Sequence, residues 1–164
     1  MKSSMVVLLF SVPPSTIKSS FGAWSLSNKT EVSELNGTWA INCENGITDL
    51  DINKNEGFLS LYDFNAIYIN IKVDKVVDKE EYVLKFDGTF SQKNYYAEML
   101  SIDDDEISKE KPIGTLIINK HGKAELRWVG LYNDLKKKLE FVGDDFLFIK
   151  ENGGKKPIFL EKCN

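Results

Sequence analysis

Few residues in this chain of 164 have the types and spacing that catalysis requires. His121 is the only histidine, and it lies in an Asn-Lys-His-Gly-Lys segment that is typical of a tight turn. A Ser-His-Asp or Cys-His set would have to be built around this one side chain, so we interpret it as an exposed turn residue. The segment Glu-Asn-Gly-Gly-Lys-Lys lacks the spacing of a phosphate-binding loop. The sequence therefore predicts a protein that is not an enzyme, with no catalytic residue, cofactor or metal ion.

Acidic and aromatic residues offer a different chemistry, the binding of a partner. The longest acidic run, at positions 103–106, lacks the spaced Asp/Asn and Gly residues of a calcium loop. It is either a solvated loop or a surface for a basic protein. Separately, the aromatic residues Tyr96, Trp128 and Tyr132 could line a ligand pocket or a protein-binding surface, and core packing is the alternative for Trp128. The candidate partner-binding residues are Asp103, Asp104, Asp105, Glu106, Tyr96, Trp128 and Tyr132.

The charge balance limits the class of partner. The formal net charge is −4 and the isoelectric point is near 5.1. Nucleic-acid-binding domains usually carry a basic face, whereas the lysines here are scattered. We therefore expect no nucleic-acid partner, and an acidic protein favours a basic partner through electrostatic steering.

The chain has two cysteines, Cys43 and Cys163, one near each end of the strand-rich region. In an exported protein such a pair usually forms one disulfide, which would tie the first strand to the last. In a cytosolic protein the two would instead be buried free thiols. Their spacing does not suit a metal site, because only one histidine accompanies them.

The N-terminal segment differs from the rest of the sequence. Lys2 precedes an apolar run at 5–12, which is too short to span a bilayer but long enough for a signal-peptide core. We predict a signal peptide at 1–22, a flexible segment at 23–35 and one domain at 36–164, with the protein periplasmic or secreted and not inserted stably in a membrane. The alternative is a disordered start with no targeting role.

Short strands with turn signals between them follow along the domain. The clearest is 66–74, where Ile67, Ile69 and Ile71 alternate with polar residues in strict period two. Further strands are predicted at 37–43, 47–53, 58–62, 82–86, 112–119, 124–132, 138–143, 144–150 and 157–163. The pattern predicts an all-β fold, a single antiparallel barrel of about eight to ten strands, with a β-sandwich as the alternative.

The segment Glu-Leu-Asn-Gly-Thr-Trp at 34–39 resembles the Gly-x-Trp opening of the first strand in lipocalins and fatty-acid-binding proteins. The resemblance implies a closed, lipocalin-like barrel in which Trp39 plugs one end. In those families the tryptophan often packs against an arginine, and Arg127 is the only arginine in this chain. The lipocalin Thr-Asp-x-x-Arg motif is absent.

A second resemblance covers more of the chain. The segments Asn-Gly-Thr-Trp at 36–39, Ile-Ser-Lys-Glu-Lys-Pro-Ile-Gly at 107–114, Trp-x-Gly-x-Tyr at 128–132 and the final Lys-Cys are similar to a family of small exported bacterial proteins. That family has no assigned activity. The resemblance implies an exported all-β protein with a single disulfide, and it assigns no catalytic residues.

Two functions fit these observations. One is a binding protein of the bacterial envelope that blocks a basic protein, either lysozyme or a secreted toxin, in the manner of lysozyme inhibitors and immunity proteins. The other is a lipocalin-like carrier of a small apolar ligand, which needs an open cavity inside the barrel. A filled barrel would favour the first function, and an apolar cavity larger than about 300 Å³ would favour the second.

Overall fold

The structure, a computed structural model, describes residues 33–44, 48–62, 67–90, 102–119 and 121–163. The elements in chain order are the 3₁₀ turn η1 (Ser33–Leu35), β1 (Gly37–Ala40), β2 (Leu50–Asn53), β3 (Glu56–Tyr62), β4 (Ile67–Lys75), β5 (Glu81–Phe90), β6 (Pro112–Ile118), β7 (Lys123–Trp128), β8 (Leu131–Asn133), β9 (Lys138–Glu140), the helix α1 (Leu147–Glu151) and β10 (Ile158–Lys162). The predicted signal peptide at 1–22 lies outside the described residues.

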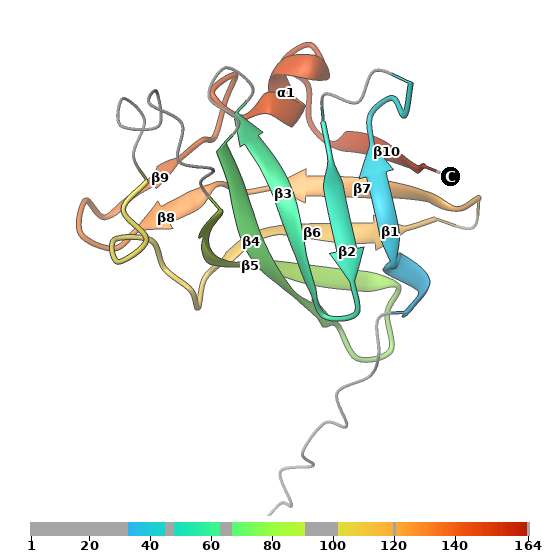
Figure 1. The fold of residues 1–164 in the computed structure, drawn as a ribbon, viewed down its shortest axis with the longest axis horizontal. Coiled ribbons are helices and arrows are strands. Elements are labelled where there is room, and N and C mark those ends of the chain that lie inside the picture. Colours follow the sequence, from blue (N-terminus) through green and yellow to red (C-terminus); the bar gives the residue numbers. More distant parts are fainter. Residues whose placement is uncertain (1–32, 45–47, 63–66, 91–101, 120, 164) are drawn as a thin grey trace, which may run out of the picture.

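Eight strands of the described chain close into one antiparallel barrel in the order β1-β10-β7-β6-β5-β4-β3-β2 (Figure 1). Strands β8 and β9 form a separate hairpin at the side of the barrel. The predicted barrel is confirmed, and the alternative of two stacked sheets is wrong. Closure removes the free sheet edges that an open sandwich would have to protect.

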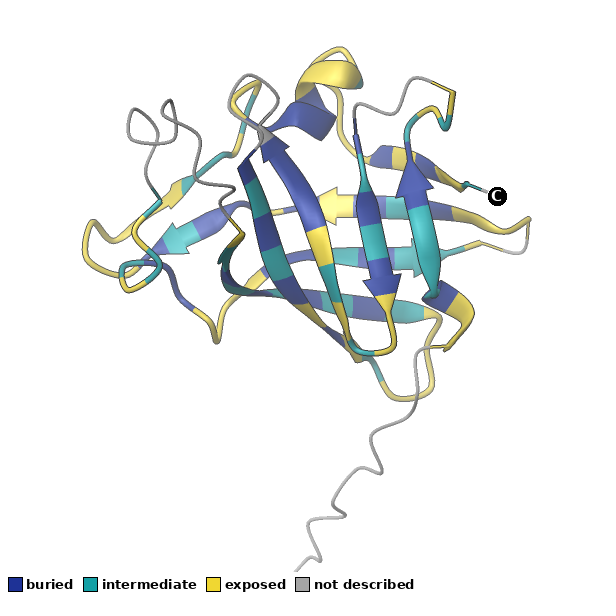
Figure 2. Ribbon diagram, in the orientation of Figure 1, coloured by how far each residue is buried: buried dark blue, intermediate teal, exposed yellow. Residues whose placement is uncertain are grey.

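Buried residues alternate with partly or fully exposed ones along the barrel strands, as the alternation in the sequence predicts (Figure 2). Along β4, Ile67, Ile69, Ile71 and Val73 are buried, while the residues between them are partly or fully exposed. The same period recurs in β5 and β7. The largest fully buried side chains are Trp39, Tyr82, Phe86, Phe146 and Phe148. Inward-facing side chains therefore make the barrel interior a packed core.

Two predicted strands differ in the structure. Residues 144–150 were expected to be extended, but Leu147–Glu151 form helix α1. Its residues Leu147, Phe148 and Ile149 are all buried, and a short, continuously apolar run reads the same in a buried strand as in a buried helix. The predicted strand at 124–132 is two strands that part at Gly130, where φ is +119° and an added Cβ would lie 2.8 Å from the Glu140 carbonyl oxygen.

A disulfide between Cys43 and Cys163 lies beside the seam where the first and last strands of the barrel meet. The two Cα atoms are 5.4 Å apart, and the amide of Cys163 donates a hydrogen bond to the carbonyl oxygen of Thr38 (2.8 Å). Strands β1 and β10 pair at only two positions, Trp39 with Lys162 and Ala40 with Glu161. The predicted disulfide is confirmed, and the alternative of two free thiols is wrong.

Trp39 is buried in the core and is 2% exposed. Its indole N–H donates to the Leu35 carbonyl oxygen (2.9 Å), and the Lys162 ammonium lies 5.5 Å from its ring centroid. Arg127 is exposed on the outer face of β7 and pairs with Glu125 (2.6 Å). The cation above Trp39 is therefore Lys162, and the expected pairing with Arg127 is wrong, because Arg127 points out of the barrel wall.

The 3₁₀ turn η1 joins the barrel more tightly than a flexible segment ending at residue 35 would allow. Leu35 is fully buried. The Glu34 carboxylate accepts hydrogen bonds from the Tyr82 hydroxyl and from the Lys75 ammonium (2.8 Å). These two bonds, led by the one from Lys75, lower the pKa of Glu34, while burial raises the pKa of Tyr82 to about 12. The domain therefore begins no later than Ser33.

Candidate functional site

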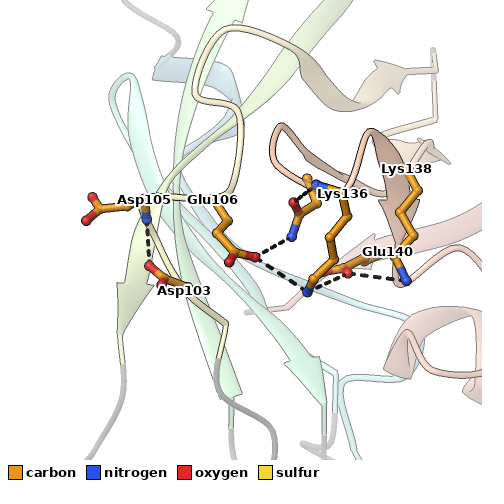
Figure 3. Close-up of polar contacts among 7 residues, drawn as sticks. Asp103, Asp105, Glu106, Lys136, Lys138 and Glu140 are labelled. Carbon is orange, nitrogen blue, oxygen red and sulfur yellow. Dashed lines mark hydrogen bonds and ion pairs between the residues drawn. The ribbon is translucent and has the colours of Figure 1, made fainter.

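The acidic run at 103–106 is a structured turn, and its four carboxylates have different roles. Asp103 and Asp105 are exposed, and the Asp105 amide donates to the Asp103 carboxylate (3.1 Å; Figure 3). Glu106 and Asp104 are partly buried and bonded to the rest of the domain. The turn therefore exposes the carboxylates of Asp103 and Asp105, whereas those of Asp104 and Glu106 bond to the rest of the domain.

Glu106 attaches the turn to the β8–β9 hairpin. Its carboxylate accepts a hydrogen bond from the Asn133 side-chain amide (2.8 Å) and lies 3.5 Å from the Lys136 ammonium (Figure 3). The Asn133 bond first, and the charge of Lys136 after it, hold the pKa of Glu106 below its ordinary value. The backbone repeats the link, since the Asp134 amide donates to the Glu106 carbonyl oxygen (2.7 Å). Glu106 thus positions the hairpin.

Asp104 binds the end of β5 that extends past β6. The last β5–β6 pair is Lys85 with Pro112, so the backbone of Thr89 lies beyond that ladder. The Asp104 carboxylate accepts from the Thr89 amide (3.0 and 3.1 Å) and from the Thr89 hydroxyl (2.8 Å). A Cβ at Gly88 would lie 3.1 Å from this carboxylate. The Asp104 carboxylate therefore accepts hydrogen bonds from Thr89 of β5. It is less available to a partner than the exposed carboxylates of Asp103 and Asp105.

The predicted aromatic residues have different surroundings in the described part of the chain. Trp128 is 5% exposed; its ring stacks on Phe146 with centroids 4.0 Å apart, and its indole N–H donates to the Phe141 carbonyl oxygen (2.6 Å). Tyr132 is half-buried beneath the Lys111 ammonium, which lies 3.0 Å from the ring centroid. Tyr96 lies outside the described residues. Trp128 is a core residue, so its assignment to a partner-binding surface is wrong.

A different aromatic group lies on the outer wall of the barrel. Phe58 of β3, Tyr68 of β4 and Phe90 of β5, together with Asp49 and Asn70, line a recess of about 480 Å³, which we call the aromatic recess. Tyr68 pairs directly with Phe90 across the β4–β5 ladder, and Asn70 pairs with Phe58 across the β3–β4 ladder. Side chains at paired positions point to the same face, so the ladders bring these side chains together.

The recess is open to solvent and has a defined ring geometry. Phe58 and Phe90 are 40% and 55% exposed. The rings of Phe58 and Tyr68 meet edge to face, with centroids 6.2 Å apart and an interplanar angle of 84°. Asn70 lies opposite Gly88 in the β4–β5 ladder. The recess therefore presents Phe58 and Phe90 to solvent beside Tyr68 and Asn70.

Asp49 supplies a carboxylate at the recess. Burial, and to a smaller extent the neighbouring charge of Asp51, raises the pKa of Asp49 above its ordinary value. Within the described ranges, no lysine or arginine lies at ion-pair distance from this carboxylate. Asp51, by contrast, accepts a hydrogen bond from the Thr38 hydroxyl (2.9 Å). A cation at the recess would therefore supply a charge partner that Asp49 lacks in the described part of the chain.

Sequence reasoning missed this recess, although part of its signal was present. The strand pattern placed Tyr68 and Asn70 on the polar face of 66–74. With Leu59 and Leu61 inward, the same alternation turns Phe58 outward in β3. An outward aromatic residue on each of two adjacent strands is a detectable pattern, but its register depends on hairpin lengths that the sequence alone does not give.

Catalytic and metal chemistry gain no support from side-chain placement. His121 is exposed in the turn between β6 and β7, where its amide donates to the Asn119 side chain (2.9 Å). Across the described ranges, no three His, Cys, Asp or Glu side chains gather as metal ligands would. No helix among the same residues has the length and apolar character needed to cross a bilayer.

The functional assignment therefore depends on what the outer wall presents. The barrel interior is packed with apolar side chains, and the aromatic recess with Asp49 is a part of the wall where apolar and acidic groups combine. Comparison with known proteins finds no matching protein family, no matching curated protein and no matching solved structure.

Proposed function

We propose that this chain is an exported, non-enzymatic binding protein of the bacterial envelope that blocks a basic protein partner through its outer wall. The observation that carries the proposal is the contrast between the filled interior and the open aromatic recess. Inward positions hold side chains such as Trp39, Tyr82 and Phe86, each almost fully buried. Binding energy is therefore available outside the barrel rather than within it.

The charge of the wall supports a basic partner. The net charge is −4, and Asp49 and Asp51 lie on the β2 side of the exposed Phe58. The exposed carboxylates of Asp103 and Asp105 add negative charge in the turn that binds the end of β5. Charges at the rim of an interface mainly raise the association rate and make it sensitive to salt. Lysozyme and secreted toxins are basic partners of the kind we expect.

The disulfide supports an exported protein, because such bonds persist in oxidising compartments. Export, a periplasmic or secreted location and the signal peptide at 1–22 remain part of the proposal. The carrier function has less support, because inward-facing apolar side chains occupy the space where a lipocalin-like ligand would sit.

The test uses surface plasmon resonance to measure binding of the full oxidised chain to lysozyme at low ionic strength. As the matched control, an acidic protein of similar size replaces lysozyme. We expect lysozyme to bind, the control not to bind, and the association rate to fall as salt rises. Binding to no basic protein in a panel of lysozymes and basic secreted toxins, together with saturable binding of a fluorescent fatty acid, would overturn the proposal in favour of the carrier.

A further inference from the structure

We propose that the aromatic recess is the binding site for a single lysine or arginine side chain of the protein partner. This inference rests on the proposed function and makes it more specific, because it names the chemical group and the residues that receive it. The residues are Phe58, Tyr68 and Phe90 for the apolar stem and ring contacts, and Asp49 for the charge.

The ring geometry suits a cation. An ammonium or guanidinium group is attracted to the face of an aromatic ring when it lies within about 6 Å of the centroid. The edge-to-face arrangement of Phe58 and Tyr68 turns one ring face toward the edge of the other, so the pair forms a corner and not a flat platform. Phe90, paired with Tyr68 on the neighbouring strand, extends the apolar wall of that corner. A long aliphatic stem can lie along such a wall while its charged end remains near solvent.

The carboxylate is placed to complete the site. Asp49 lines the recess, and its raised pKa reflects partial burial without a compensating cation in the described residues. Asp104, which lies on the β5 side, already receives hydrogen bonds from Thr89. One acid is therefore available to a partner and the other is committed to the fold. A cation in the recess would restore to Asp49 the favourable interaction that burial removes.

Other strongly exposed apolar residues of the described chain lie apart from the recess. Val77 and Leu135 are 74% and 72% exposed, but each lies in a turn, and scattered single residues of this kind are normal on a surface. Phe159 on β10 is 57% exposed and pairs with Glu125 of β7. It provides a matched control, since it is also an outward phenylalanine in the barrel wall but does not line the recess.

A neutral sugar is the other ligand that an outward aromatic surface with Asp and Asn could bind. Sugars favour a flat stacking surface with several donors around it, and the 84° angle between Phe58 and Tyr68 does not provide one. The uncompensated carboxylate also favours a cation over a neutral ligand. We therefore assign the recess to a cationic side chain and include a sugar as an outcome of the test.

The first experiment uses the full oxidised chain with ¹³C-labelled aromatic residues. It is titrated with Nα-acetyl-arginine methylamide, Nα-acetyl-lysine methylamide and, as a neutral isostere of arginine, Nα-acetyl-citrulline methylamide. We expect the cationic probes to shift the ring signals of Phe58, Tyr68 and Phe90 and leave those of Phe159 in place. Equal shifts with citrulline, shifts only with a neutral oligosaccharide, or no shifts at these rings would each overturn the assignment.

The second experiment uses the lysozyme assay with the variants Phe58→Ala, Asp49→Asn and the control Phe159→Ala. We expect the first two to weaken binding about tenfold, from the loss of one cation–π or charge contact, and the control to bind as the wild type does. Unchanged binding in Phe58→Ala and Asp49→Asn would overturn the recess as the contact but leave the proposed function standing. Wild-type protein that binds no basic protein but still shows the arginine-specific ring shifts would overturn the proposed function and keep the cation site.

Discussion

The stack of Trp128, Phe146 and Phe148 and the recess of Phe58, Tyr68 and Phe90 use similar side chains in opposite surroundings. In the stack, centroids are 4.0 and 5.3 Å apart, the rings are nearly parallel, and the indole N–H has a backbone acceptor. In the recess, two of the three rings are at least 40% exposed and the adjoining carboxylate has no cation in the described chain. In the stack, the rings and the indole N–H have their contacts within the fold. In the recess, the rings and the carboxylate remain available to a partner.

We expect the largest effect on stability from a substitution in the buried stack. Phe146 is fully buried and stacks with both Trp128 and Phe148, so Phe146→Ala removes two aromatic contacts and leaves a cavity. We expect a loss of about 3–5 kcal/mol in the free energy of unfolding, measured by urea denaturation. A loss below about 1 kcal/mol would mean that the stack does not hold α1 on the barrel.

A substitution at Asp104 tests whether this residue of the acidic turn is bonded into the fold or is available to a partner. Asp104→Ala leaves the Thr89 amide and hydroxyl without their acceptor, and we expect the unfolding free energy to fall by about 1–3 kcal/mol. The matched change Asp105→Ala removes an exposed carboxylate of the same turn and should alter stability by less than about 0.5 kcal/mol. Thermal melts of the two variants measure this difference in stability. Equal melting temperatures would mean that Asp104 contributes no more to stability than Asp105 does.

The Glu34 carboxylate is expected to make the stability of the fold depend on pH. Because its pKa is lowered in the fold, the Glu34 carboxylate contributes stability above its ordinary value of 4.5, and this contribution is lost as pH falls through the lowered value. The side chain is 50% exposed, so solvent screening limits the contribution to less than about 1 kcal/mol. Glu34→Gln should therefore flatten the loss of stability measured between about pH 5 and pH 3. An unchanged profile would assign that loss to other carboxylates.

The smallest expected effect on stability is at the recess itself. Phe90 is 55% exposed at the end of β5, so Phe90→Ala should change the unfolding free energy by no more than about 0.5 kcal/mol. The measurement is the same urea titration used for Phe146→Ala. A loss approaching that of the stack would show that Phe90 is needed by the fold, and the distinction between the two aromatic groups would then fail.

The barrel could be predicted from the sequence because its strands alternate with period two. The inward face of 66–74 can be identified from Ile67, Ile69 and Ile71 without reference to neighbouring strands. The two cysteines indicated that the ends of the domain meet. Helix α1 could not be predicted in the same way. Its apolar run is buried on all sides, and tertiary packing rather than periodicity decides its conformation.

The site was harder to predict than the fold, because it depends on which polar groups find partners. In the sequence, Asp103 and Asp104 are equivalent neighbours, yet the Asp104 carboxylate bonds to the part of β5 that extends past its pairing with β6. The alternation in 66–74 places Tyr68 on the outward face, but the strand register, which the sequence alone does not give, brings it beside Phe90 and Phe58. The sequence pattern therefore predicted which faces point outward but not which outward side chains lie together.

The short seam between β1 and β10 has a consequence for the lifetime of the folded protein. Its two register pairs, like the cysteines 120 residues apart beside them, join opposite ends of the domain, so closing the seam forms contacts of very high sequence separation, which form slowly and cost chain entropy. Strand β1 has only four residues, and a brief separation of this strand would expose the core to proteases. The covalent bond beside the seam keeps the two strands within reach during such openings, so that reclosing competes well with cleavage. We therefore expect the Cys43–Cys163 bond to slow proteolysis of the folded chain.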